Sequence, residues 1–384
     1  MPADGGKGLG NNSAGAPYGL GYCDAHCPRD VPFIGGEANL DGSSGSCCIE
    51  MDVFQGNKVA TSMSAHPCNT AGLRMCSGTE CGDPQQHEYY RGVCDRDGCD
   101  FNPYRLGNKS FFGLNAAVDT LHPITVVTQF HTEDGSDSGQ LSEIRRLYVQ
   151  HGRVIGNSGS ALREVQGDSI TEKLCSQEKA AFVKSRDPYN MAGDYNQFGL
   201  MGGLSTMGAA FDRGMVLALS IADDTAQRMQ WLDSKLPAGA SPEAPGVARG
   251  PCELSWGDPV WMRHQLRDSY AQFSNLRFGE IGSTHAGLVS AALAGSTNLA
   301  LKQRVGGSLR VADGAISLLG FCGVAAVSFV AASLGVASRW RRGPQASEMV
   351  AWGDSRAASA ERRRTGVDAR LLTAGRAGTE FGCE

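Results

Sequence analysis

The sequence predicts an all-β protein, a β-sandwich, on three observations. Short strand patterns recur along the chain, at residues 124–130, 147–150, 215–220 and 272–278. Gly-rich stretches, part of a total of 51 glycines, separate them and supply turns. Residues 170–185 carry only a mild helical pattern. Short strands with glycine-rich turns and little helix are typical of two packed sheets.

The elements follow one another in a simple order. Residues 1–32 are expected to be loop, and the Gly/Ser-rich residues 33–46 lead into a strand that begins near residue 49. Cysteine and glycine dominate residues 60–110, where regular structure should be sparse. The segment 131–145, rich in Asp, Ser and Gly, should join the strands at 124–130 and 147–150 as a hairpin loop. Residues 215–220 are predicted to be a buried strand, and 272–278 a half-exposed one.

An uncharged segment, 315–337, lies near the C-terminus and is followed by Arg339, Arg341 and Arg342. About 23 such residues are enough to span a bilayer as a helix. The basic flank would place the tail in the cytoplasm and the preceding domain outside the cell or in the secretory pathway. The alternative is a buried helix rich in Ala and Gly. We therefore expect a domain over 1–284, a linker over 285–313, a single transmembrane helix over 314–338 and a disordered cytoplasmic tail over 339–384.

Charge and cysteine content narrow the class further. The net charge of -5 gives no reason to expect a nucleic acid as a partner. Most of the 13 cysteines lie between Cys23 and Cys99, which indicates an oxidising compartment and a disulfide framework. Zinc is the competing interpretation, but the spacings are irregular and no paired histidines follow, so neither a metal nor a cofactor is expected. The N-terminus has no basic and apolar segment that would form a signal peptide.

The segment from Cys47 to Gln55, with the sequence Cys-Cys-Ile-Glu-Met-Asp-Val-Phe-Gln, carries the strongest chemical signal. In an extended strand Glu50 and Asp52 share one face, while the apolar residues between them face the other way. Two carboxyl groups on one face suit the lining of a cleft, although such a pair can also belong to a solvated face.

This segment resembles glycoside hydrolase family 7, the family of cellobiohydrolases and endoglucanases. The resemblance also rests on His66-Pro67-Cys68 and on the run from Cys99 to Asn108. It implies a concanavalin-like jelly roll that ends near Ser283. It also implies that a long N-terminal part of the family's sandwich is missing here, because the chain is a fragment, a mis-started gene model or a truncated variant.

The family's motif implies roles for individual residues. Glu50 matches the nucleophile and Asp52 the carboxylate that supports it, but Gln55 occupies the position of the general acid/base. A bend or bulge would have to turn that position towards Glu50. His66 matches a residue near the nucleophile, with a structural histidine as the alternative. The resemblance further implies sugar-contacting or supporting roles for Tyr22, Asp24, Asp97, Asp100, Arg105, Trp231 and Arg249, any of which could instead be structural. Ala222 stands where the family has a tryptophan platform.

The resemblance also implies a cysteine pairing: Cys23–Cys48, Cys27–Cys47, Cys68–Cys94, Cys76–Cys81 and Cys99–Cys175. It leaves Cys252 without a partner, because that partner lies in the part of the family domain that is missing here.

Two principal hypotheses follow. The chain hydrolyses cellulose or a related β-glucan with retention of configuration, or it is a membrane-displayed pseudoenzyme that binds the glucan without cutting it. A third possibility is a disulfide-stabilised surface or adhesion domain. The oligomeric state and the choice between exo and endo action are left open.

Overall fold

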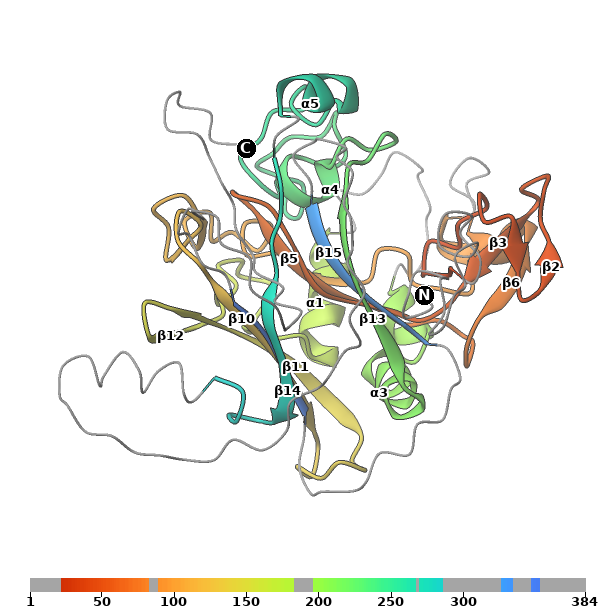
Figure 1. Ribbon diagram of the computed structural model, residues 1–384, viewed down its shortest axis with the longest axis horizontal. Helices are drawn as coiled ribbons and strands as arrows, with labels where there is room; N and C mark the ends of the chain where they lie inside the picture. The colour runs from red at the N-terminus through yellow and green to blue at the C-terminus, as the bar shows by residue number, and fades with distance from the viewer. Residues whose placement is uncertain are drawn as a thin grey trace, which may run out of the picture.

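The structure is a computed structural model that describes residues 22–82, 89–182, 196–266, 269–285, 326–333 and 347–352. Two five-stranded antiparallel sheets form the described framework (Figure 1). The first has the order β13-β15-β4-β5-β7, with bounds Met215–Ala222, Ala326–Ser333, Glu50–Gly56, Thr61–His66 and Cys99–Phe101. The second has the order β12-β11-β10-β16-β14, with bounds Arg153–Gly156, Leu141–Gln150, Thr125–Thr132, Ser347–Trp352 and Ser274–Glu280.

Three two-stranded sheets and several short helices complete the described part. The small sheets pair β1 (Phe33–Ile34) with β2 (Glu37–Ala38), β3 (Ser44–Cys47) with β6 (Arg74–Ser77), and β8 (Phe112–Gly113) with β9 (Val118–Asp119). The α-helices are α1 (Glu172–Phe182), α2 (Gln197–Leu200), α3 (Gly203–Arg213), α4 (Gln230–Asp233) and α5 (Pro259–Gln265). Two 3-10 helices, η2 and η4, span Gly78–Cys81 and Tyr89–Arg91.

The main hydrophobic core joins the two large sheets. Met51 and Met63 of the first sheet belong to the same buried cluster as Val126 and Ile144 of the second. Alternate residues of each strand face this cluster, as the pleat requires. The arrangement is the β-sandwich that the sequence predicts.

The predicted elements of the sandwich are found close to their expected places. The strands expected at 124–130 and 147–150 are parts of β10 and β11, and the helix expected within 170–185 is α1. The prediction that 215–220 is buried is wrong, because β13 is half-buried at its start and exposed at its end. It occupies the edge of its sheet, where an apolar strand has a partner on one side only.

The predicted transmembrane helix over 314–338 is not borne out where the structure describes it. Residues Ala326–Ser333 form strand β15, which pairs with β4 on one side and β13 on the other. A short apolar run fits a central strand as well as a buried helix, so periodicity alone does not distinguish them. Among the described residues no helix is long and apolar enough to cross a bilayer. The rest of 314–338 lies outside the described residues, as do most of the expected linker and tail.

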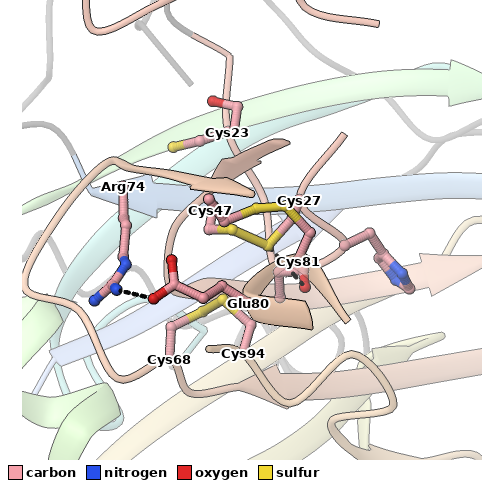
Figure 2. The surroundings of a disulfide bond; sticks show 12 residues. Cys23, Cys27, Cys47, Cys68, Arg74, Glu80, Cys81 and Cys94 are labelled. Atoms are coloured by element: carbon pink, nitrogen blue, oxygen red, sulfur yellow. Dashed lines mark hydrogen bonds and ion pairs between the residues drawn. A yellow bond between two sulfur atoms is a disulfide. The ribbon is translucent and has the colours of Figure 1, made fainter. Parts of the chain in front are cut away.

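Five disulfides cross-link residues between Cys23 and Cys175. Their pairing is the one that the family resemblance implies: Cys23–Cys48, Cys27–Cys47, Cys68–Cys94, Cys76–Cys81 and Cys99–Cys175. Figure 2 shows several of these cysteines crowded around Cys47. The sulfur atoms of Cys27, Cys47 and Cys76 lie within 4.8 Å of one another, but each belongs to a disulfide and is not a free thiolate ligand. Cys252 is also disulfide-bonded, so the expectation that it lacks a partner is wrong.

Candidate active site

A β-bulge in β4 decides which side chains share the face of Glu50. Along β5 the partners of Glu50, Asp52 and Gln55 are His66, Ser64 and Ser62, three alternate residues that lie on one face. The three steps from Asp52 to Gln55 pass only two steps of β5, so β4 carries one extra residue there. In an uninterrupted strand Gln55 would lie on the face opposite Glu50. The bulge brings both to the same face.

Residues of the opposite sheet hold the bulge in place. The carbonyl oxygen of Val53, within the bulge, accepts hydrogen bonds from the Arg146 guanidinium and from Thr128 Oγ1. Arg146 is fully buried and lies over the rings of Phe54 and Tyr148. A bulge carbonyl has lost its regular strand partner, so this buried donor satisfies a group that would otherwise destabilise the core.

The loop that follows Tyr22 packs against Glu50. The backbone N–H of Ala25 donates to Glu50 Oε2 at 2.9 Å. The two oxygens of Asp24 accept from the Tyr22 hydroxyl at 2.5 Å and from the His26 N–H at 2.7 Å. The disulfides Cys23–Cys48 and Cys27–Cys47 tie both ends of this loop to β3 and to the start of β4.

His66 pairs with Asp52 rather than with Glu50. Its Nε2 lies 3.2 Å from Asp52 Oδ2, and its Nδ1 lies 2.9 Å from the Asp95 carbonyl oxygen. Asp52, the carboxylate that matches the family's supporting residue, forms no hydrogen bond with Glu50, although both side chains are buried, with exposed fractions of 3% and 5%. Asp52 Oδ1 and Ser64 Oγ have no hydrogen-bond partner in the described part of the chain. They are polar atoms available to a ligand on this face.

The electrostatics of this cluster favour the protonated form of Glu50. Burial, followed by the charges of Asp52 and Asp24, raises the pKa of Glu50 well above its ordinary value. Burial alone would lower the pKa of His66, but its hydrogen bond to Asp52 and the neighbouring carboxylates outweigh that and raise it to about 10. Burial and Asp24 also raise the pKa of Tyr22, which keeps its hydroxyl a donor.

Gly98 allows the turn 95–98 to approach His66, which leads to a testable prediction. Its φ is +61°, and a Cβ there would lie 2.5 Å from His66 Cε1. We expect Gly98→Ala to displace His66 from Asp52 and to destabilise the fold by about 1–3 kcal/mol. An NMR titration should show the pKa of His66 falling back towards the ordinary value for histidine.

The matched control is Gly78→Ala. Gly78 has a similar φ of +55°, but nothing lies within 4 Å of the added Cβ. This variant should share the backbone strain and leave the titration of His66 unchanged. Equal titration curves for His66 in both variants would contradict the proposed contact.

A second group of predicted residues surrounds Asp100. Asp100 Oδ2 lies 3.0 Å from Arg105 Nη1 and 3.2 Å from Arg249 Nη1, and its other oxygen accepts from Ser62. Arg105 is buried and also pairs with Glu178 of α1 at 3.0 Å. Arg105 therefore braces the sheet against α1.

Trp231 joins this second group through its backbone. Its carbonyl oxygen accepts from Arg249 Nη1 at 3.3 Å, and its indole Nε1 donates to Asp224 at 3.0 Å. Ser62, the cross-strand partner of Gln55, connects the group to β4. Gln55 thus lies between the Glu50 cluster and the Asp100 group.

Asp233 lies next to this group and makes the stability of the fold depend on pH. It is buried, and burial raises its pKa to about 7 despite a hydrogen bond of 2.7 Å from Asn57. The folded state holds a proton that the unfolded state, with a pKa near 3.9, releases. The resulting stabilisation is complete below about pH 4 and is lost as the pH rises through 7.

We expect Asp233→Asn to remove this loss, since its amide oxygen still accepts from Asn57. Relative to the wild type, the free energy of unfolding of the variant should increase by up to about 4 kcal/mol between pH 4 and pH 8. Denaturant unfolding at the two pH values measures the difference. The control Asp30→Asn, at an exposed position, should show no such trend. A pH-independent difference between Asp233→Asn and the wild type would contradict the prediction.

The structure brings most of the predicted site residues together. Tyr22, Asp24, Glu50, Asp52 and His66 form one cluster, and Asp100, Arg105, Trp231 and Arg249 form the adjoining group. Asp97 is half-buried and lies near enough to His26 to affect its charge. Sequence reasoning missed the Ala25 N–H, His26 and Arg96. The first is a backbone group without a side-chain signature, and the other two become relevant only through the folding of two loops.

Comparisons with known proteins identify the class. A family model for glycosyl hydrolase family 7 matches residues 1–285. A solved family 7 cellobiohydrolase from Daphnia pulex is 40% identical, with a TM-score of 0.59 over 65% of this chain and 57% of that one. A cellobiohydrolase from Melanocarpus albomyces complexed with cellotetraose is 32% identical, with a TM-score of 0.53 over 65% and 56%. An endoglucanase I complexed with cellobiose is 34% identical, with a TM-score of 0.51 over 68% and 56%.

The chain therefore belongs to glycosyl hydrolase family 7. It is similar to cellulases of both the cellobiohydrolase and the endoglucanase type. It spans a little more than half the length of the solved relatives that it matches.

Proposed function

We propose that this chain hydrolyses the β-1,4-glucosidic bonds of cellulose or a related glucan, with Glu50 as the nucleophile. The observation that supports this most directly is the placement of Glu50 on one face with Asp52, His66 and Gln55, produced by the bulge in β4. Two relatives are solved with cellobiose and with cellotetraose, which supports a β-1,4-glucan as the ligand of this face.

The reaction would proceed with retention of configuration. The Glu50 carboxylate attacks the anomeric carbon, the bond to the leaving sugar oxygen breaks, and a glycosyl ester forms. Water then attacks the same carbon and releases Glu50. The Ala25 N–H and the positive charge of His66 favour the ionised form of Glu50 that the attack requires. Asp52 holds His66 in place, and its free Oδ1 is available to a sugar hydroxyl or to protonated Glu50.

The second candidate is a carbohydrate-binding pseudoenzyme, and Gln55 favours it. The side-chain amide of Gln55 occupies the acid/base position but cannot protonate a leaving oxygen. General acid–base catalysis contributes on the order of 10²–10⁴-fold. Loss of this contribution would weigh most on cellulose, whose sugar leaving group is poor.

The framework of disulfides supports a site of action in an oxidising compartment, outside the cytoplasm. The disulfides Cys23–Cys48 and Cys27–Cys47 are buried and hold the loop whose Ala25 N–H contacts Glu50, so reducing conditions should disorder the site itself.

The test is to incubate the full chain with cellohexaose and to follow both cleavage and the anomer released first by proton NMR. Release of the β-anomer supports retaining hydrolysis. Binding in calorimetry without cleavage supports the pseudoenzyme. Neither binding nor cleavage would rule out both proposals.

A further inference from the structure

Most groups near Glu50 that could exchange a proton are already engaged. Both oxygens of Asp24 accept hydrogen bonds, and both ring nitrogens of His66 have partners. Asp52 is buried against His66, and Asp100 is paired with two arginines. Glu50 is required as the nucleophile. Apart from Glu50, only Asp52 among these groups keeps an oxygen without a partner in the described part of the chain, Oδ1, and its other oxygen is committed to His66.

His26 is different. Its side chain is exposed, and neither ring nitrogen forms a hydrogen bond with a described residue. It follows Ala25, whose N–H contacts Glu50, and its ring centroid lies 6.1 Å from that of His66, the cross-strand partner of Glu50. Its backbone is fixed on both sides, since its N–H donates to Asp24 and its carbonyl oxygen accepts from Arg96 Nη1 at 2.7 Å. The Cys27–Cys47 disulfide follows at once.

We propose that His26 transfers the proton that Gln55 cannot, as the general acid/base of this chain. The inference rests on the proposed function. In the first step the imidazolium of His26 donates its proton to the glycosidic oxygen while that oxygen leaves the anomeric carbon and Glu50 bonds to it. In the second step the neutral imidazole accepts a proton from the attacking water, the ester bond to Glu50 breaks, and the imidazolium and the Glu50 carboxylate are regenerated.

The surroundings of His26 predict the protonation states of His26 and Glu50. Desolvation by the surrounding residues and the positive charges of Arg96 and His66 lower the pKa of His26 to about 4, although the residue as a whole is exposed. Asp24, Glu50, Asp52 and Asp97 are the acidic groups around it, and of these Asp52 and Asp97 oppose the shift.

These shifts favour a resting site with neutral His26 and protonated Glu50, and the active form differs only by transfer of that proton. Because the active form is the less populated of the two, hydrolysis should be slow. Because the two forms carry equal numbers of protons, the rate should change little with pH above about 4, until Glu50 itself ionises.

The test is a double-mutant cycle in the full chain with cellohexaose. His26→Gln should lower kcat/KM on the order of 10²-fold in the wild type. In the Gln55→Glu background, which supplies its own acid, the same change should cost less than about 3-fold. A residue that only shapes the loop or binds sugar would cost the same in both backgrounds. His122→Gln, at another exposed histidine, is the matched control and should be silent in both.

Azide supplies a second readout, with 2,4-dinitrophenyl β-cellobioside as the substrate. Its leaving group needs no proton, so His26→Ala should still form the glycosyl ester. The ester should then accumulate, because no base activates the water that hydrolyses it. Azide should then restore turnover and yield β-cellobiosyl azide, whereas the wild type should give none.

Equal costs of His26→Gln in both backgrounds, or the absence of the azide product, would overturn the inference. An inactive wild type beside an active Gln55→Glu would also reject His26 while preserving Glu50 chemistry. If Gln55→Glu is inactive as well, the proposed function itself fails.

Discussion

Glu50→Gln is expected to abolish hydrolysis of cellohexaose, with a loss of roughly 10⁴-fold or more where the parent rate is high enough to measure it. The amide has the same shape but cannot attack the anomeric carbon, so no glycosyl ester can form. Binding should persist, because the Ala25 N–H still finds an oxygen at this position. Initial rates and calorimetric titration with cellohexaose separate the two effects.

The same variant should be more stable than the wild type at neutral pH. The folded state raises the pKa of Glu50, so the carboxyl group stabilises the fold at low pH and this contribution is lost as the pH rises through the raised value. The amide of the variant does not ionise, so its contribution to stability does not fall as the pH rises. Unfolding at pH 4 and pH 8 should therefore show the advantage of Glu50→Gln growing with pH. A variant that is inactive because it is misfolded would show the opposite.

The sequence predicts the arrangement of β4 well, because the strand period restricts it. Glu50 and Asp52 share a face in any extended strand, and only a bulge could bring Gln55 to join them. The structure contains that bulge. What holds it could not be predicted, since Arg146 comes from the opposite sheet and lies 93 residues from Val53 along the chain.

The errors have a common physical origin. Residues 326–333 are apolar enough for a buried helix or a central strand, and the choice depends on strand edges at β4 and β13 that the local sequence does not encode. The pairing of Asp52 with His66 is also not evident from the sequence. The strand register places Asp52 opposite Ser64, and His66 reaches Asp52 diagonally from the position opposite Glu50. Diagonal contacts of this kind depend on side-chain length and on the turn at Gly98 rather than on spacing.

Gln55→Glu should raise kcat/KM for cellohexaose by about 10²–10⁴-fold, the usual contribution of general acid–base catalysis. Gln55 is half-buried on the face of β4 that carries Glu50, opposite Ser62, and its side-chain amide forms no hydrogen bond with a described residue. A carboxyl group therefore fits without displacing an existing contact. With 2,4-dinitrophenyl β-cellobioside the gain in the rate of the first step, formation of the glycosyl ester, should be smaller, because this leaving group needs no proton. Burst kinetics separate this step from hydrolysis of the ester.

Ser62→Ala provides a control for the surroundings of the new carboxyl group, because Ser62 links this position to Asp100. In the double variant Ser62→Ala/Gln55→Glu most of the increase in kcat/KM should remain, since the proton donor is the new carboxyl group and not the serine. Gln55→Met, of similar length and without a titratable group, should show none. If glutamate and methionine behave alike while cellohexaose still binds, proton transfer does not limit this site, and the difference from active cellulases must lie in how the sugar is held over Glu50.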